Sequence, residues 1–423
     1  MKICAAIALG VTVMAFAVPP AERAAPPRVF AHYMPWFRAE ETDQGIVWDH
    51  WQWYGKGAKH DPDTVLPNGR RDIASAYYPL IGPYDSLDAA VLEYHLLAAK
   101  AAGIDGFIAD WYGPDTFTDQ VFARMVSVAD RYGMTVALCL EEKSFFPGFA
   151  QVQNRGEAKD TMERYVRHAL DHYARSPSYL KHGGRPVFLM FNGYGEGPLG
   201  PNYFSPEETR EVLAQFGDPG ILLVRGWFDP AYVGTVPGAY CWVTSASERE
   251  TFYTNAIAAR RDGRLEYVVG VANPGFDDSP VNGWGNGPRV TDRRGTQEYR
   301  DHWLEVLRQQ PDAVQIVTWN DFQEGTTIEP AGDYDFRFVD LTEEFVGKFT
   351  GRPVSLTDNG WPLRLYHLRK RAAALRDERT HTEWGRRLDD WALAFSRGQR
   401  FLMGLRLWWL EWRMPAPPAA ETG

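Results

Sequence analysis

Eight short apolar segments separated by helical patterns are the feature that most restricts how this chain can fold. Most of them are continuously apolar, which is typical of strands covered on both faces by other layers. They comprise residues 28–31, 106–110, 135–140, 186–191, 221–225, 239–243, 267–272 and 313–318. The sequence therefore predicts an α/β fold in which eight parallel strands alternate with helices, the (β/α)8 or TIM barrel.

The clearest helical pattern follows the first of these segments and reads SLDAAVLEYHLLAAKAAG. Its apolar residues recur every three or four positions, Ser86 is a suitable N-cap, and Gly103 ends the pattern. Similar patterns cover residues 121–133, 205–217 and 296–310. The connection between the fifth and sixth segments is irregular, so the strand count could differ by one.

The N-terminus has the form of an export signal. Lys2 precedes an apolar stretch from Ile3 to Val18 that contains the small-x-small cleavage site Ala15-Phe16-Ala17. We predict a signal peptide over residues 1–17, a Pro/Ala linker over 18–27, and export to the periplasm or medium of a bacterium. The alternative is an uncleaved membrane anchor, although the apolar stretch is short for a span.

Composition excludes some classes of protein. With 423 residues, 44% of them hydrophobic, the chain can bury a large core. A net charge of −10 argues against nucleic acid as a partner, because phosphate binding needs a basic face. The ten His are scattered and form no HExxH or Cys/His cluster, so no metal or other cofactor is predicted. Cys139 and Cys241 lie in strand-like runs and are expected to be buried thiols, or a disulfide if the fold brings them together.

The C-terminal region differs from the rest of the chain. We assign residues 28–350 to the barrel and 351–423 to a basic, aromatic-rich helical extension. From Trp361 onward there are twelve Lys or Arg against seven Asp or Glu. Arginines alternate there with the rings and apolar side chains of Trp391, Phe401, Leu405, Trp408, Trp409 and Trp412. Such a segment would suit peripheral contact with a membrane interface, or it packs its rings on the outer face of the barrel. The oligomeric state is not indicated.

Carboxylates and aromatic rings follow most of the predicted strands. In a barrel the functional groups belong at the C-terminal ends of the strands, so these side chains should share one rim. Rings stack on sugar faces, acids accept hydrogen bonds from hydroxyls, and a close carboxyl pair can act on a glycosidic bond. The sixteen Trp and twenty Tyr are many for this length and fit the same use. The candidates are Tyr33, Trp36, Asp110, Trp111, Glu141, Tyr194, Tyr240, Trp284, Asn320, Asp321 and Glu324.

Five segments resemble glycoside hydrolase family 99, the endo-α-mannosidase and endo-α-mannanase family, in the same order along the chain. They are HYMPWF, YYPLIGPYDSLDAAVLEYHLLAAKAAGIDGFIADWYG, VANPGFDDSPV, RRGTQEYRDHW and TWNDFQEGTTIEP, and they run from Val29 to Pro330. The resemblance implies a (β/α)8 barrel that cleaves internal α-mannosidic bonds with retention and without a metal. It also implies a polysaccharide or oligosaccharide substrate, catalytic carboxylates at Asp321 and Glu324, and a sugar-binding acid at Glu141.

One motif departs from family 99. Members of that family usually carry Glu, Trp and His where this chain has Asp321, Phe322 and Gln323. The phrase TWND is more similar to glycoside hydrolase family 71, the fungal-type α-1,3-glucanases. A related α-glucan is therefore an alternative substrate. Because a misplacement of about 1 Å can cost about a hundredfold in rate, a weakly catalytic barrel that binds polysaccharide in an export or assembly system is a second alternative. A scaffold that works through its tail is a third.

The roles of the two carboxylates follow from this resemblance. Glu324 would be the general acid and base at the glycosidic oxygen. Asp321 would act as base on the sugar's own 2-hydroxyl, which attacks the anomeric carbon. A covalent glycosyl-Asp321 and an inverting route stay open, since retaining pairs lie about 5–5.5 Å apart and inverting pairs further. The sequence does not decide between internal and terminal cleavage.

Overall fold

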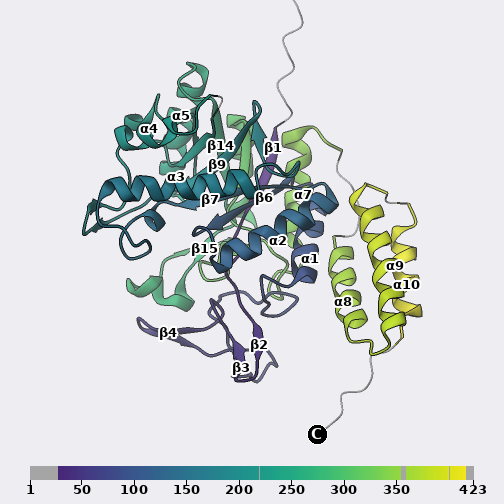
Figure 1. Cartoon of the computed structure of the whole chain (residues 1–423). Coiled ribbons are helices and arrows are strands. Elements are labelled where there is room, and N and C mark those ends of the chain that lie inside the picture. The colour runs from purple at the N-terminus through teal and green to yellow at the C-terminus, as the bar shows by residue number, and fades with distance from the viewer. Residues whose placement is uncertain (1–26, 219, 354–358, 400, 416–423) are drawn as a thin grey trace, which may run out of the picture.

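The predicted strands form a closed parallel barrel in the computed structural model, which describes residues 27–218, 220–353, 359–399 and 401–415 (Figure 1). First and last strands pair directly, with Arg28 opposite Ala313, and β9 pairs with β12, so the ring has no open edge. The (β/α)8 prediction is confirmed. In ring order the strands are β1 (Arg28–Tyr33), β6 (Gly106–Trp111), β7 (Thr135–Glu141), β9 (Arg185–Phe191), β12 (Leu222–Gly226), β13 (Gly238–Tyr240), β14 (Tyr267–Ala272) and β17 (Ala313–Ile316).

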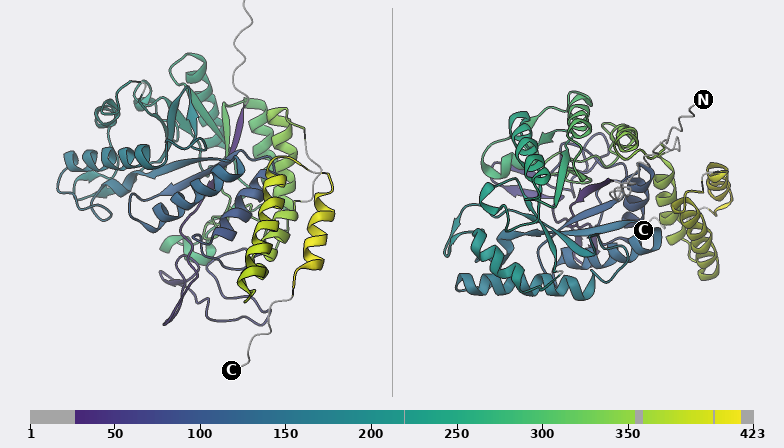
Figure 2. Two further views of the ribbon diagram at one scale, coloured as in Figure 1. Left: turned by 45° about the vertical axis from the view of Figure 1, so that its right-hand side comes forward. Right: turned by 90° about the horizontal axis from the view of Figure 1, so that it is seen from above.

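Helices form the outer layer around the strands (Figures 1 and 2). They are α1 (Ala89–Ala101), α2 (Phe117–Tyr132), α3 (Arg155–His172), α4 (Pro206–Ala214), α5 (Ala246–Arg261), α6 (Gln297–Gln309) and α7 (Arg337–Thr350). Between β12 and β13 the described chain has only the 3-10 turn η2 (Pro230–Tyr232), which is the irregular connection seen in the sequence.

The predicted N-cap of the first helix is wrong by two residues. Asp88, not Ser86, caps α1, and its Oδ1 accepts a hydrogen bond of 2.8 Å from the backbone N of Ala90. Ser86 is fully buried, and its backbone N donates to the carbonyl of Phe37 at 2.8 Å. Both residue types cap helices well, so the local pattern could not choose between them.

Short hairpins decorate the end of the barrel at which the strands finish, at the bottom of Figure 1. After β1 come the antiparallel pairs β2 (Glu40–Thr42) with β3 (Gly45–Val47) and β4 (Trp53–Gly55) with β5 (Ala58–His60). After β14 come β15 (Phe276–Asp277), the 3-10 segment η3 (Ser279–Gly285) and β16 (Val290–Thr291). Elsewhere β8 (Lys181–His182) pairs with β9, and β10 (Glu196–Gly197) pairs with β11 (Gly200–Pro201).

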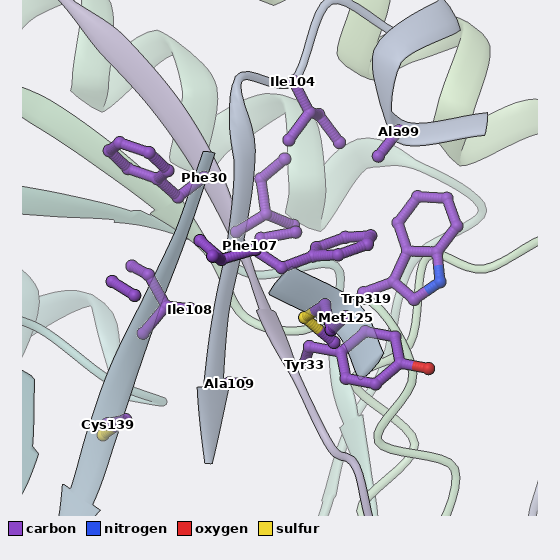
Figure 3. Packing of buried hydrophobic residues seen from close by; sticks show 14 of the residues in the cluster. Phe30, Tyr33, Ala99, Ile104, Phe107, Ile108, Ala109, Met125, Cys139 and Trp319 are labelled. Atoms are coloured by element: carbon purple, nitrogen blue, oxygen red, sulfur yellow. The ribbon is translucent and has the colours of Figure 1, made fainter. Parts of the chain in front are cut away.

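Aromatic side chains fill the wall between β1, β6 and α1 (Figure 3). The ring centroids of Tyr33 and Phe107 are 5.0 Å apart, and those of Phe107 and Trp319 are 5.4 Å apart. All three side chains are fully buried. Burying a ring such as Phe107 contributes about 1.5–3 kcal/mol to the stability of the fold. The cluster therefore gives the loop after β17 a rigid, well-packed support.

Three helices form the predicted C-terminal extension: α8 (Trp361–Ala373), α9 (Glu378–Ser396) and α10 (Met403–Arg413). They stand beside the barrel and contact it at α1 and α2 (Figures 1 and 2). Arg369 joins the parts, since its guanidinium bonds Glu93 of α1 at 2.7 Å and Asp389 of α9 at 2.6 Å.

The rings of the extension divide into two groups. Trp391 is fully buried and donates its Nε1–H to the Met403 carbonyl at 3.1 Å. By contrast Phe401, Leu405, Trp408 and Trp412 are exposed. Packing on the protein thus accounts for some of the rings and leaves the others facing out.

The predicted signal peptide, and the linker up to residue 26, lie outside the described residues. In the part of the chain that is described, no helix combines the length and apolarity that a membrane span requires. Cys139 and Cys241 are both buried free thiols, so they do not form the disulfide that was the alternative.

Candidate active site

The loop after β17 carries Asp321 and Glu324 at the end of the barrel where the strands finish. Asn320 fastens this loop to the chain that leaves β1: its Oδ1 accepts from the Met34 backbone N at 2.7 Å, and its Nδ2 donates to the Met34 carbonyl at 3.0 Å. The backbone N of Asp321 donates to Thr318 Oγ1 at 2.8 Å. The segment that leads into the two carboxylates is therefore held by hydrogen bonds to Met34 and Thr318.

Asp321 and Glu324 form a coupled pair. Asp321 is 3% exposed, Glu324 is partly exposed, and the backbone N of Glu324 donates to Asp321 Oδ1 at 2.9 Å. Burial, and then the Glu324 charge, raise the pKa of Asp321 well above its ordinary value. Burial also raises the pKa of Glu324. Because one ionised carboxylate disfavours the other, the pair retains a proton at a pH where isolated carboxyls would have lost theirs.

Trp284 holds the Glu324 side chain from the loop after β14. Its Nε1 donates to Glu324 Oε1 at 3.1 Å, which lowers the pKa of Glu324 and partly offsets burial. Three successive residues of η3, Asn282, Gly283 and Trp284, have left-handed backbone conformations. Asn282 Nδ2 donates to the Lys56 carbonyl at 2.7 Å, so the hairpin β4–β5 supports this strained segment.

Arg293 holds the loop after β17 through its backbone carbonyls. This buried guanidinium donates to the carbonyls of Gly325 at 2.9 Å and Thr327 at 2.7 Å, and it lies 4.0 Å from the centre of the Tyr77 ring. Gly325 has φ +58°, and a Cβ there would lie 2.8 Å from the Asp277 carbonyl oxygen. Only glycine therefore fits where the loop turns past β15.

A buried polar network supports the loop from the barrel wall. Tyr84 O–H donates to Glu329 Oε2 at 2.9 Å and also accepts from Asn320 Nδ2 at 3.1 Å. His95 Nε2 lies 3.3 Å from Glu329 Oε1, and its Nδ1 lies 3.0 Å from the Tyr33 hydroxyl. Each of these partners is buried, so loss of one would leave its neighbours unsatisfied in a low dielectric.

A second carboxylate pair, Asp110 and Glu141, ends β6 and β7. Burial raises the pKa of both, and Glu141 also raises that of Asp110, to which it is hydrogen-bonded. Lys143 Nζ lies 3.3 Å from Glu141 Oε2. The same ammonium lowers the pKa of Glu324, so it acts on both carboxylate pairs. The two pairs thus share one electrostatic environment.

A pocket of about 570 Å³ opens beside the loop after β17. It reaches the loop at Gln323, the residue before Glu324, and His50 Nδ1 lies 2.8 Å from Gln323 Oε1. The Trp36 ring stacks on His50 with centroids 4.8 Å apart. Flat aromatic faces among polar groups suit the binding of sugar rings. The lining residues are Trp36, Asp49, His50, Gln52, Trp53, Tyr54, Tyr112, Thr116, Phe117, Thr118 and Gln323.

The structure separates the candidates from the sequence into five groups. Asp321, Glu324 and Trp284 are together at the loop after β17, Asp110 and Glu141 form the second pair, and Trp36 lines the pocket. Tyr194 is 67% exposed, and Lys143 Nζ lies 5.8 Å from its ring centre. The fully buried candidates are Tyr33, Trp111, Tyr240 and Asn320.

The fully buried candidates have structural contacts. Trp111 donates its Nε1–H to Asp119 Oδ1 of α2 at 3.0 Å. The Tyr240 hydroxyl lies 3.8 Å from Cys139 Sγ inside the barrel. Asn320 and Tyr33 belong to the loop anchors described above. Asn320 and Tyr33 thus support the loop after β17, and contact of any of the four with a substrate would require rearrangement.

One group in the described chain has three side chains close enough to share a metal ion: His32, Asp110 and Cys139, whose ligand atoms lie within 4.8 Å of one another. Burial raises the pKa of the Cys139 thiol well above its ordinary value and lowers that of His32 to about 3. A thiol must ionise to bind a metal, and these surroundings oppose that ionisation.

Some neighbours of the site were not among the candidates from the sequence. Lys143, His50 and Arg293 lie in the loops after β7, β1 and β14, and Gln323 belongs to the loop after β17 itself. A lone cation or imidazole in a loop is usually solvated, so only the fold identifies these residues. The rule that strand ends carry function could have pointed to Lys143, which follows β7 by two residues.

Comparison with known proteins agrees with this architecture. Rat glycoprotein endo-alpha-1,2-mannosidase is 24% identical over 334 residues, which is 72% of this chain and 68% of the relative. A glycoprotein endo-alpha-1,2-mannosidase-like protein of Danio rerio is 25% identical over 331 residues, 71% of this chain and 70% of the relative. The structure of the GH99 endo-alpha-mannosidase from Bacteroides thetaiotaomicron superposes with a TM-score of 0.59 at 17% identity, covering 76% of this chain and 97% of that chain.

The sequence also matches the model of glycosyl hydrolase family 71 over residues 74–344, which span the strands from β6 to β17 and the loop with both carboxylates. That match covers more than half of the chain. This protein is a glycoside hydrolase, and it belongs to glycosyl hydrolase family 71.

Proposed function

We propose that this glycoside hydrolase cleaves internal α-mannosidic or related α-glycosidic bonds of a polysaccharide or oligosaccharide, with Asp321 and Glu324 as its working carboxylates. The observation that carries the proposal is the carboxyl pair in the loop after the last strand, where Glu324 N donates to Asp321 Oδ1 at 2.9 Å beside an aromatic pocket. The curated relatives named endo-alpha-1,2-mannosidases support an α-mannoside as the first substrate to test.

The two carboxyls would divide the chemistry. Glu324 is partly exposed and is oriented by Trp284, which suits a proton donor to the leaving glycosidic oxygen. Asp321 would accept the proton of the sugar's 2-hydroxyl as that oxygen bonds to the anomeric carbon and the glycosidic bond breaks. Water would then open the anhydro-sugar, giving its proton to Glu324 while Asp321 returns a proton to the 2-oxygen. The configuration at the anomeric carbon would be retained.

Substrate binding would have to set the proton on the correct carboxyl. In the free protein burial raises the pKa of both carboxyls, so the pair can share one proton. A hydroxyl that donates to Asp321 favours its ionised form, so the proton would pass to Glu324 as the sugar binds. Activity would then require both the pair and a 2-hydroxyl in contact with Asp321.

An α-1,3-glucan is the second candidate substrate. The motif TWND and the family 71 match favour it over a strict family 99 specificity, and Asp321 is one methylene shorter than the Glu usual in family 99.

We also propose that the protein is exported and that it is divided into the segments predicted from its sequence. The N-terminal pattern supports a signal peptide over residues 1–17 and a linker over 18–27, with the barrel at 28–350 and the extension at 351–423. N-terminal sequencing of the protein recovered from a bacterial periplasm or medium would test this. A mature N-terminus still at Met1 would contradict cleavage.

The decisive experiment measures products released from α-1,2-mannan and α-1,3-glucan by the wild type, Glu324→Gln and Asp321→Asn. We expect the wild type to cleave one polymer and each variant to lose at least about a hundredfold in rate. NMR of the first-formed anomer would then test retention. Cleavage by either variant at the wild-type rate would reassign the chemistry, and no cleavage by the wild type with binding intact would favour the carbohydrate-binding barrel.

An activated substrate separates the two roles. A glycosyl fluoride or dinitrophenyl glycoside has a leaving group that needs little protonation, so it should restore much of the rate of Glu324→Gln. The same substrate should not restore Asp321→Asn, because the missing base acts at the 2-hydroxyl. The opposite pattern would exchange the two assignments.

A further inference from the structure

Helix α10 is anchored to the protein along one side. Leu407 and Leu410 on that side are buried, and Gly404 allows close approach, since a Cβ there would lie 3.1 Å from the Trp361 ring. Arg364 of α8 bonds both carboxylate oxygens of Glu411, at 2.8 and 2.7 Å. The orientation of α10 is therefore fixed by packing and by an ion pair, and its opposite side is held outward.

The outward side of α10 is strongly apolar. The described chain has fourteen exposed large hydrophobic side chains, and six of them fall between Phe401 and Trp412. They form what we term the α10 face: Phe401 (86% exposed), Leu402 (50%), Leu405 (62%), Trp408 (57%), Trp409 (39%) and Trp412 (67%). Within α10 the spacing of 405, 408 and 412 follows the helical repeat, so these side chains share one surface. Single exposed apolar residues are ordinary, whereas a cluster on one surface marks an interaction site.

Arginines surround the α10 face. Arg397, Arg406 and Arg413 are exposed, and the Arg413 guanidinium lies 5.6 Å from the centre of the Trp412 ring. The acidic residue of the helix, Glu411, is already paired with Arg364. The surface thus combines tryptophan and leucine with exposed positive charge on a protein whose net charge is −10.

A groove of about 340 Å³ between α9 and α10 continues the α10 face. Leu402, Leu405 and Trp409 form its apolar wall, and Arg387 and Arg406 lie on its sides. Asp390 is the acidic side chain that lines it. An apolar channel beside two guanidiniums fits an acyl chain whose phosphate lies next to the arginines.

We propose that the α10 face docks this hydrolase on the surface of a membrane containing anionic phospholipid. No described helix can span a bilayer, so α10 would lie in the plane of the interface, with its rings at the level of the headgroups and its arginines on lipid phosphates. A second copy of the chain fits less well, because a two-fold interface would bring the arginines of both copies together.

The place of α10 in the fold suits this arrangement. In Figures 1 and 2 the extension stands beside the barrel, and α10 packs on α8 and α9, away from the strands. The loops with the carboxylates lie at the end of the barrel, not on the side that carries α10. Docking through α10 would leave the mouth of the barrel free to receive a polymer.

Vesicle sedimentation of the mature protein tests the proposal. We expect binding to vesicles of POPC and POPG (7:3). Binding to vesicles of POPC alone should be weaker by a factor of about ten or more. The variant Leu405→Ser/Trp408→Ser/Trp412→Ser should lose at least about tenfold in binding, and Arg406→Gln should lose about fivefold, as expected for one interfacial cation. Leu304→Ser, which removes another exposed leucine from α6, is the matched control and should bind like the wild type.

Three results would overturn it. These are no sedimentation of the wild type with either vesicle, equal binding by the triple variant, and a wild-type dimer in light scattering that the triple variant makes monomeric while neither binds vesicles. The last result would assign the α10 face to contact between copies. Unchanged thermal unfolding and unchanged hydrolysis of a soluble substrate would show that the triple variant is folded.

Discussion

The indole N–H of Trp284 donates a hydrogen bond of 3.1 Å to Glu324 Oε1, and the two residues come from loops after different strands, β14 and β17. This bond favours the ionised carboxylate, so it lowers the pKa of Glu324 against the effect of burial. The tryptophan thus sets both the direction in which the carboxyl points and the pH at which it loses its proton.

Replacing Trp284 by Phe should therefore raise the pKa of Glu324. If Glu324 is the general acid, activity falls as it deprotonates, and the alkaline limb of kcat/KM against pH should move to higher pH. Trp53→Phe is the control, because Trp53 packs edge-on against Trp284 at 5.2 Å and its own indole N–H has no partner in the described structure. An unmoved limb in Trp284→Phe would mean that another group is the acid.

Asp321→Asn should stabilise the protein at neutral and alkaline pH. The folded-state pKa of Asp321 is raised above its unfolded value, so its contribution to stability is fully present below the unfolded pKa and is lost as pH rises through the folded pKa. Asparagine removes that loss while its Oδ1 can still accept from Glu324 N.

Urea unfolding at pH 8 and pH 4.5 would measure the effect. We expect the variant to exceed the wild type by about 0.5–2 kcal/mol at pH 8, with a smaller difference at pH 4.5. The exposed Asp218→Asn should show no such dependence on pH. A difference that grows toward low pH would contradict the assigned direction of the Asp321 shift.

Tyr84→Phe should weaken the support of the loop after β17. The change removes the hydroxyl that donates to Glu329 Oε2 and accepts from Asn320 Nδ2, and such losses cost about 1–3 kcal/mol. Chemical denaturation would measure the cost, with the exposed Tyr203→Phe as control. Equal stability of the two variants would show that the network adds nothing measurable.

Gly325→Ala should damage the site more than the fold. Its left-handed conformation alone costs an L-residue roughly 1–2 kcal/mol, and the new Cβ would also meet the Asp277 carbonyl at 2.8 Å, so the loop must move. A shift of about 1 Å in the carboxylates can cost about a hundredfold in kcat.

Gly263→Ala isolates the conformational part of that effect. Gly263 also has a left-handed backbone, φ +72°, but no atom lies within 4 Å of the place that a Cβ would take there, at the end of α5. It should lose similar conformational stability and keep its activity. Equal activity of both variants would show that the loop tolerates displacement.

The barrel and the region of the site could be predicted because both depend on local pattern. Continuous apolar runs indicate buried strands, and parallel strands present their ends on one side, so Asp321, Glu324, Asp110 and Glu141 could be grouped from the order of residues alone. What the pattern could not give was the direction of each side chain. Asp110 and Trp111 are adjacent, yet the first faces Glu141 and the second bonds Asp119 under α2, because successive residues of a strand point to opposite faces.

Residues that are distant in sequence from the carboxylates could not be predicted as their neighbours, for a different reason. Lys143 acts on the loop after β17 through its charge, and His50 and Arg293 act on it through hydrogen bonds, and only the fold brings these residues near it. The C-terminal rings show the same limit. Their periodicity indicated a helix with an apolar side, but only packing shows that Trp391 is inside while Trp408 and Trp412 face out.

The pairing of β1 with β17 makes hydrolysis depend on the last strand of the barrel. The loop that bears Asp321 is fixed by Met34 and Tyr84 near one end of the barrel sequence and by Arg293 near the other. A nascent chain that has not yet emerged from the ribosome beyond residue 313 lacks the strand that closes the ring. Cleavage thus cannot begin before β17 has emerged, and the appearance of activity in a refolding experiment would mark the moment at which the first and last strands meet.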